Sequence, residues 1–274
     1  MKNILIPTDL SDCTKNTIKY AVNLGIKSKA KLFFYHANEK KEISNSVILK
    51  DIVKKTFSDL NVILKDFQTE FITEACDFSN QSILKLSSDY STDLIIMGTS
   101  HESIKTTFFG SHVSDFINDA NCPVLSVPHN YNCTDIDSIG YASTLYDLKS
   151  RIKEIIPFAK SLNAGIEIFH VYPVFPQKVD VKKYNSEKIL AQIKTEYSYD
   201  KIKFCLIKTP FMNEPVSGIR EFVNSHNPDI LVMYHKPRGL FDKLVLDFGT
   251  TVSVVKTSPI PVLSLTRKTA CKIM

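Results

Sequence analysis

Residues 93–98 read DLIIMG, residues 229–234 read DILVMY, and both runs are apolar after an opening aspartate. An unbroken apolar run of this kind is typical of a central strand in a parallel sheet. Each run is followed by a polar loop, a Gly-Ser or Gly-Thr pair and a short closing segment, PVLSV at 123–127 or PVLSL at 261–265. The same order of segments therefore occurs twice in the chain.

The two copies keep nearly the same spacing over most of their length. The offsets are 135 residues for Asp12 and Asp147, 134 for His36 and His170, 136 for Asp93 and Asp229, and 138 for Pro123 and Pro261. We infer a tandem duplication of one domain, with domains expected at residues 1–130 and 135–268. Each domain is long enough to bury a core of its own, and residues 128–135 form a short polar connector.

The composition narrows the class of protein. The chain has 274 residues, and its 34 Lys and Arg against 29 Asp and Glu give a net charge of +5, too mild and dispersed to indicate nucleic-acid binding. No stretch reaches the roughly 20 apolar residues of a membrane span. Pro7 and Asp9 interrupt the first apolar run before it can form a secretion signal. We therefore expect a cytoplasmic protein that binds neither nucleic acid nor membrane.

The spacing of cysteine and histidine gives no sign of a metal centre. The six cysteines form no C-x-x-C pair, so reduced structural thiols are expected. The seven histidines show no H-x-x-x-H spacing, so no metal ligands are assigned.

The hydrophobic pattern alternates strands and helices in each half. In the first half it predicts strands at 3–6, 31–37, 69–74, 93–97 and 124–127, and helices at 12–27, 47–66, 80–88 and from 111 to 118 or beyond. In the second half, Ile152, Ile155, Ile156 and Ala159 lie on one helical face. This alternation predicts a parallel sheet with helices on both faces, and ligand sites at the carboxyl ends of the strands where the strand order reverses.

Three segments of the first half carry groups suited to a nucleotide. Residues 7–11 (PTDLS) follow the first strand, residues 98–101 (GTSH) follow the fourth, and Gly110 and Ser111 open the last helix. The glycine after the fourth strand would let the backbone approach a ligand, and a helix N-terminus favours an anion. Asp9 could accept hydrogen bonds from a ribose or a base edge. The group contains no evident nucleophile or general base.

The chain resembles the universal stress protein family in four segments of its first half. These are IPTDLS at 6–11, DLIIMGTS at 93–100, GS at 110–111 and CPVLSV at 122–127. The second half shows the resemblance more loosely. The family pattern is G-x-x-G, nine residues and G-[S/T] after a strand like DLIVMG, and this combination with its flanking strands is fairly specific.

The resemblance implies both a fold and a ligand. The fold would be α/β, with two tandem, doubly wound, five-stranded parallel-sheet domains that are Rossmann-like and similar to the adenine nucleotide alpha hydrolases. The two closing strands would pair across a twofold axis in an intramolecular pseudo-dimer, which also protects apolar edges that invite aggregation. Nucleotide-binding members of the family hold ATP in the crevice, with the opening aspartate near the adenosine and the glycine loop at the phosphates.

Candidate contacts for ATP lie in the first domain only. They are Thr8, Asp9, Ala37, Gly98, Thr99, His101, Gly110 and Ser111. This domain departs from the family pattern, because His101 stands where the second glycine is expected and the interval to Gly110 is one residue short. The altered loop should narrow the space for phosphates. His101 could offer its imidazole to a phosphate or be a surface loop residue.

The second domain departs further from the family pattern. Thr144 stands opposite Asp9, so the carboxylate near the adenosine is lost. Tyr234 stands opposite Gly98 and places a phenol where backbone would meet the ligand. Only the pair at 249–250 (GT) keeps the helix-opening signature, so we expect no nucleotide in this domain.

A basic loop follows the fourth strand of the second domain. It covers residues 235–243 and begins with HKPRG. Such a loop could hold an anion, or it could be a solvated cluster of charges on the surface. The sequence leaves this choice open.

The sequence also leaves three functions open. The first is a cytoplasmic stress-response binding module, not an enzyme, with adenine nucleotide in the first domain only. The second is a scaffold that binds no nucleotide and acts through an unidentified protein partner. The third is slow ATP hydrolysis, for which the sequence supplies no base. A higher oligomer of the pseudo-dimer also stays open.

Overall fold

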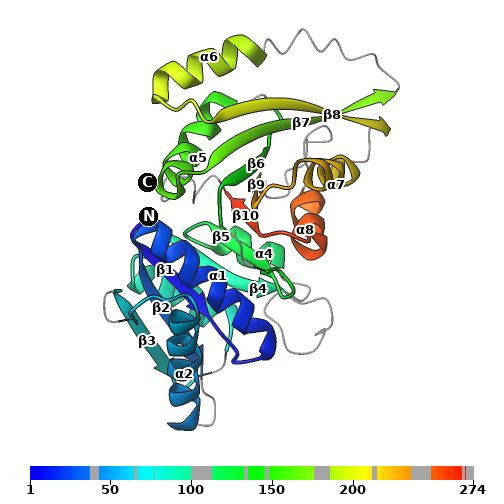
Figure 1. Ribbon diagram of the computed structural model, residues 1–274. Helices are drawn as coiled ribbons and strands as arrows, with labels where there is room; N and C mark the ends of the chain where they lie inside the picture. Colours follow the sequence, from blue (N-terminus) through cyan, green and yellow to red (C-terminus); the bar gives the residue numbers. More distant parts are fainter. Residues whose placement is uncertain are drawn as a thin grey trace.

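Strands and helices alternate along both halves of the chain in the computed structural model (Figure 1). The structure describes residues 1–37, 43–64, 67–76, 78–99, 113–132, 135–145, 148–175, 186–211, 215–235, 248–266 and 269. The first half contains β1 (Asn3–Pro7), α1 (Asp12–Ser28), β2 (Lys31–Ala37), α2 (Ile43–Asp59), β3 (Thr69–Glu74), α3 (Asn80–Asp89), β4 (Leu94–Thr99), α4 (Val113–Asp119) and β5 (Val124–Pro128). The second half contains β6 (Ser138–Ala142), α5 (Leu148–Leu162), β7 (Gly165–Phe175), α6 (Ser186–Tyr197), β8 (Ile202–Phe211), α7 (Pro215–His226), β9 (Ile230–Tyr234), α8 (Phe248–Thr257) and β10 (Val262–Leu265). The predicted α/β class is confirmed.

The two halves join into one sheet through their last strands. Over the described residues the strand order is β3-β2-β1-β4-β5-β10-β9-β6-β7-β8. Strands within each half pair in parallel, whereas β5 and β10 pair antiparallel with Leu125 opposite Leu263. Figure 1 shows the first half below this seam and the second half above it. The predicted intramolecular pseudo-dimer is therefore confirmed, and neither closing strand is left as an open edge.

Each face of the sheet is covered by its own set of helices. Residues of α1, α2, α5 and α6 belong to one buried cluster, and residues of α3, α4, α7 and α8 belong to the other. Strand residues alternate between the two clusters, so Ile4 and Ile6 join the first and Leu5 joins the second. Burial of the central strands on both faces explains why their sequences show continuous apolar runs rather than an alternating pattern.

The duplication is preserved in the backbone conformation of the turns. The described non-glycine residues with positive φ form four pairs at the repeat offset: Leu10 (62°) with Leu145 (69°), Lys29 (54°) with Asn163 (56°), Asn61 (55°) with Ser198 (47°), and Ser91 (47°) with Asn227 (47°). The left-handed conformation is uncommon outside glycine. Its recurrence at equivalent positions shows that both halves keep the same turns although the residues differ.

The aspartate that opens each apolar run has a structural role. Oδ2 of Asp93 accepts hydrogen bonds from the backbone N–H groups of residues 2 and 3, at 2.5 and 3.0 Å. Oδ2 of Asp229 accepts the same bonds from residues 137 and 138, at 2.9 and 2.8 Å. These bonds join the two central strands of each domain at their amino ends. The aspartates therefore lie at the amino ends of the strands, whereas the ligand site is predicted at the carboxyl ends.

Two helix boundaries differ from the sequence prediction. The second helix, α2, spans Ile43–Asp59 rather than residues 47–66. It ends early because Asn61 adopts a left-handed conformation and the N–H of Val62 donates to the carbonyl of Phe57 at 3.0 Å, which closes the last turn. The predicted start of the last helix of the first half, at Ser111, lies outside the described residues.

The described part of the chain contains free thiols and no helix suited to cross a bilayer. Cys76, Cys122 and Cys205 are free cysteines, as the sequence predicts. No described helix combines the length and the apolar character that a membrane span requires.

Gly140 in β6 leaves room for the side chain of Phe222 on α7. A Cβ at this position would lie 2.5 Å from a ring carbon of Phe222 and 3.3 Å from Pro228. The Phe222 ring cannot yield easily, because it stacks on Phe169 with centroids 3.7 Å apart. We expect Gly140→Ala to lower the free energy of unfolding by about 1–3 kcal/mol, the usual cost of an overpacked core, as measured by denaturant unfolding.

Gly165, in the neighbouring strand β7, provides the matched control. A Cβ there would lie 3.7 Å from the carbonyl of Lys201 and 3.8 Å from that of Asp137, which are ordinary contacts. Gly165→Ala should leave stability unchanged or raise it by about 0.4–1 kcal/mol, because alanine restricts the unfolded chain more than glycine does. Equal losses in the two variants would show that the contact with Phe222 is not the cause.

Candidate functional site

The carboxyl ends of β1 and β4 meet where the strand order of the first domain reverses. From β1, the order runs through β2 to β3 on one side and through β4 to β5 on the other. Leu5 lies opposite Ile95, so three residues further on Thr8 is level with Gly98. Ligands of open α/β sheets bind outside the strand ends at such a point.

The structure brings five of the candidate residues to this edge of the sheet. Thr8 and Asp9 follow β1, Ala37 ends β2, and Gly98 and Thr99 end β4. The other candidates, His101, Gly110 and Ser111, lie outside the described residues, as do residues 236–243 of the basic loop. The first residue of that loop, His235, is 2% exposed, so it belongs to the interior rather than to a solvated charge cluster.

The loop after β1 is held by its own side chains. Thr8 Oγ1 accepts a hydrogen bond from the N–H of Leu10 at 3.1 Å, and Leu10 takes the left-handed conformation. Asp9 Oδ1 accepts from the N–H of Ser11 at 3.0 Å and from the hydroxyl of Thr14 at 2.6 Å. These local bonds fix the Asp9 carboxylate just after the carboxyl end of β1. Within the described chain, its second oxygen, Oδ2, receives no hydrogen bond and is available to a ligand.

A buried histidine supports this loop from β2. Nδ1 of His36 lies 2.9 Å from the carbonyl oxygen of Thr8, and it must be the donor because a carbonyl can only accept. The second domain repeats this support, since Nδ1 of His170 donates to the carbonyl of Ser143 at 2.8 Å. Ser143 Oγ accepts from the N–H of Leu145 at 3.1 Å, as Thr8 does in the first domain. Burial lowers the pKa of His170, although its bond to the carbonyl opposes this, so the imidazole is neutral at neutral pH.

Tyr234 and Gly98 occupy equivalent positions in the two domains, opposite Leu265 and Val127. The phenol of Tyr234 donates a hydrogen bond to the carboxylate of Glu154 on α5. Burial raises the pKa of Tyr234 strongly and the carboxylate adds to this effect, so the phenol stays protonated. The ring is therefore turned toward α5 and anchored there, and does not stand free at the strand end.

Two further side chains complete the network around Tyr234. The guanidinium of Arg151 lies 4.3 Å from the centroid of the Tyr234 ring and 4.0 Å from the Glu154 carboxylate. The Tyr141 ring meets the Tyr234 ring edge-on, with centroids 6.2 Å apart. The position of Tyr234, which corresponds to Gly98 in the first domain, is thus surrounded by a cation, an anion and a second aromatic ring.

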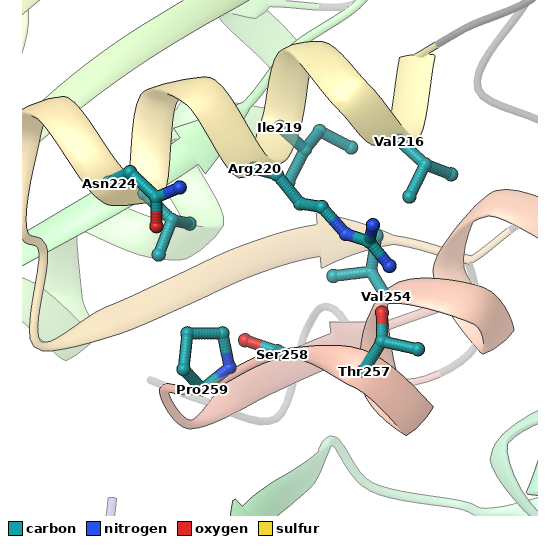
Figure 2. Close-up of a pocket in the computed structure, with 9 residues that line it drawn as sticks. Val216, Ile219, Arg220, Asn224, Val254, Thr257, Ser258 and Pro259 are labelled. Atoms are coloured by element: carbon teal, nitrogen blue, oxygen red, sulfur yellow. The ribbon is translucent and has the colours of Figure 1, made fainter.

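A cavity between α7 and α8 is too small to be a ligand site. Figure 2 shows its walls, with Ile219 and Arg220 on α7 and Val254 and Thr257 on α8. Its volume is about 20 Å³. Space of that size holds about one water molecule, so we interpret it as a packing gap between two helices.

The comparison with protein families covers both halves of the chain. The universal stress protein family matches residues 1–128 and 150–265. The chain belongs to the universal stress protein family. A comparison with curated protein sequences gave no match.

Solved structures resemble this universal stress protein over its full length. A universal stress protein from Archaeoglobus fulgidus DSM 4304 is 18% identical with a TM-score of 0.61, covering 97% of this chain and 96% of that one. A functionally unknown protein from Pseudomonas aeruginosa PAO1 is 14% identical with a TM-score of 0.66, covering 100% of this chain and 94% of that one. At these identities the likeness shows the fold, including its two tandem halves.

Several residues around the site were not found by sequence reasoning. His36 and His170 were used in the sequence analysis only as evidence of the repeat. Nothing in LFFYH or IEIFH shows that the imidazole donates a hydrogen bond to the loop after the first strand of its domain. Glu154 and Arg151 lie three residues apart on a helix, and without the position of Tyr234 they look like an ordinary surface pair. The sequence does not separate the buried Glu154 from the exposed Lys153, because both stand between Ile152 and Ile155.

Proposed function

We propose that this universal stress protein is a stress-response binding module that holds an adenine nucleotide in its first domain, residues 1–130. The second domain, residues 135–268, would act as a structural partner without nucleotide. The supporting observation is the contrast between the two strand-end sites. The first has a fixed carboxylate with an unbonded oxygen beside a glycine, and the second has Thr144 beside an anchored tyrosine.

The geometry of the first domain suggests how the ligand would lie. Oδ2 of Asp9 would accept a hydrogen bond from a ribose hydroxyl, while Oδ1 stays bonded to the turn. The strand ends at Thr8 and Ala37 would lie against the adenosine. Gly98 and Thr99 would lead toward the phosphates, since they begin the loop that carries the family's glycine pattern.

We propose binding without efficient turnover. Among the described crevice residues, Thr8, Asp9, Ala37, Gly98 and Thr99, the only titratable side chain is that of Asp9. One of its oxygens is already engaged by Ser11 and Thr14, which suits a positioning role better than proton transfer. Slow ATP hydrolysis is the alternative, and release of phosphate during long incubation with ATP and Mg²⁺ would support it.

The test is thermal unfolding of the full chain with and without millimolar ATP and Mg²⁺. A ligand at a hundred times its dissociation constant stabilises the folded state by about 2.7 kcal/mol. For a domain of this size, that corresponds to a rise in melting temperature of roughly 5–10 °C. No rise in the parent protein would favour the alternative, a nucleotide-free scaffold that acts through protein contacts.

Asp9→Asn is the informative variant. Asparagine keeps an acceptor for Ser11 and Thr14 but replaces Oδ2 by a donor, so the turn should survive while the ribose loses its acceptor. A hydrogen bond to a charged group contributes about 1.5–3 kcal/mol, so ATP affinity should fall by roughly 10- to 100-fold.

Thr144→Asn is the matched control, because it places the same residue at the equivalent position of the second domain. It should leave the response to ATP unchanged. A response lost in Thr144→Asn and kept in Asp9→Asn would show that the nucleotide binds in the second domain.

A further inference from the structure

Three side chains with metal-binding atoms converge in the second domain, outside the proposed nucleotide site. They are Glu167 on β7, Cys205 on β8 and His226 at the end of α7, and one ligand atom from each lies within 4.8 Å of the others. Nδ1 of His226 is 3.0 Å from Oε1 of Glu167. Glu167 is the third residue of β7 and α7 ends at His226, so the cluster lies toward the amino ends of the strands.

The first domain shows what this place contains when it only supports the fold. The strand registers align Glu167 with Phe33 and Cys205 with Ile72. The turns at Ser91 and Asn227 align His226 with Tyr90.

The three aligned residues of the first domain form part of its apolar packing. Phe33 and Ile72 are buried, and the rings of Phe33 and Tyr90 meet with centroids 4.9 Å apart. The second domain has a carboxylate, a thiol and an imidazole at the three positions where the first domain has a packed apolar cluster. The three positions therefore differ together in chemistry, and each side chain in the second domain carries an atom that can bind a metal ion.

The imidazole is held in place by aromatic stacking. The His226 ring lies on the Phe222 ring, with centroids 4.6 Å apart and planes at 18°. Phe222 in turn stacks on Phe169 at 3.7 Å and occupies the space left open by Gly140. The ring of His226 is thus oriented before any ion binds, which reduces the cost of ordering a ligand.

We propose that Glu167, Cys205 and His226 bind a zinc ion with three protein ligands and a water molecule in the fourth position. Thiolate, imidazole and carboxylate are the ligands that zinc takes in proteins. At bond lengths of about 2.0–2.3 Å, ligand atoms around a tetrahedral zinc ion lie roughly 3.3–3.8 Å apart. Small rotations of three side chains would bring the present atoms to that spacing.

Binding replaces the proton of the thiol by the metal. Burial raises the pKa of Cys205 to about 12, and the nearby carboxylate of Glu167 contributes to the rise. Without a cation the thiol is therefore protonated at neutral pH, which argues against a reactive nucleophile. When zinc binds, the S–H bond breaks, a Zn–S bond forms and the proton passes to solvent.

An entry path for the ion exists on the solvent side. The side chains of His226 and Glu167 are 31% and 29% exposed. Glu167 also borders a groove of about 490 Å³ along the amino ends of β6, β7 and β8. The fourth position would thus face water rather than the core.

The probe is Zn²⁺ itself, added to the full chain after treatment with a chelator under reducing conditions. Competition with a chromophoric chelator should give one tightly bound zinc per chain. Cobalt in the same site should show an absorption band from charge transfer between thiolate and metal. Cys205→Ser should abolish the band and weaken zinc binding by more than the roughly 10- to 100-fold that loss of a supporting residue costs.

Two further variants protect the result against a folding defect. His226→Tyr restores the aromatic residue of the first domain and should weaken zinc binding while the protein stays folded by circular dichroism. Glu167→Gln keeps the shape of the side chain and should also weaken binding.

Cys76→Ser is the matched control. Cys76 Sγ also lies near a carboxylate, 3.8 Å from Glu74, but the described residues give it no histidine partner in such a group. This variant should keep both the affinity and the band. Zinc bound equally well by Cys205→Ser and by the parent protein would overturn the proposal. The test is independent of ATP, so its outcome does not depend on the nucleotide site.

Discussion

Replacing Arg151 by methionine should lower the free energy of unfolding by about 3–5 kcal/mol, the usual cost of leaving a buried charge without its partner. The Glu154 side chain is 8% exposed and the Arg151 side chain is 14% exposed. Removal of the guanidinium would leave the Glu154 carboxylate with the phenol of Tyr234, and the described residues provide no other cation in an ion pair with it. Urea unfolding followed by circular dichroism measures the loss.

Two variants separate this effect from a general effect of substitution on α5. In the double variant Arg151→Met/Glu154→Met the uncompensated charge is absent, so part of the stability should return. The Tyr234 hydroxyl loses its acceptor in this variant, which keeps a cost of about 1–3 kcal/mol. Lys153→Met changes an exposed residue on the same helix and should shift stability by less than about 0.5 kcal/mol. A double variant that is less stable than Arg151→Met alone would show that the charges stabilise the domain in another way.

The network around Tyr234 also explains how the second domain accommodates a tyrosine where the first domain has Gly98. In the first domain, Thr8 is buried with its hydroxyl bonded to the turn, whereas Asp9, Gly98 and Thr99 are partly exposed. In the second domain, the phenol is turned toward α5, where Glu154 and Arg151 of the same domain contact it. We interpret these contacts as a structural network at this strand end.

Much of the fold could be predicted from the sequence because its signals are local or repeated. The apolar runs at 93–98 and 229–234 predicted central strands, and β4 and β9 are such strands. Their recurrence with PVLSV and PVLSL predicted the two domains and the pairing of β5 with β10. The strands and the duplication needed only an apolar period or a repeated segment. The pairing of the closing strands rested on the protection of apolar edges and on the resemblance to the family.

Other features could not be predicted, because they depend on side-chain direction or on contacts between distant residues. The early end of α2 depends on the left-handed conformation of Asn61, which the helical period does not reveal. The cluster of Glu167, Cys205 and His226 joins three elements, so no spacing rule for metal ligands detects it. The candidate residues Thr8, Asp9 and Gly98 were predictable because the ends of parallel strands meet at one edge.

Phe222→Ala should lower the free energy of unfolding by about 3–5 kcal/mol, the range found when a large aromatic side chain is removed from a core. Phe222 is fully buried, and its ring lies between Phe169 and His226 and against Gly140. Its removal would leave a cavity that the strand at Gly140 cannot fill, since glycine has no side chain. Denaturant unfolding gives the loss.

The same substitution should weaken zinc binding, because His226 would lose the ring on which it stacks. Leu86→Ala is the matched control, since Leu86 occupies the equivalent position on α3, four residues before Tyr90, and is 3% exposed. It should cost about 2–5 kcal/mol of stability while leaving zinc affinity unchanged. If both variants lost stability and both kept the parent's affinity for zinc, the aromatic stack would serve only the core, and the orientation of His226 would have to come from Glu167 alone.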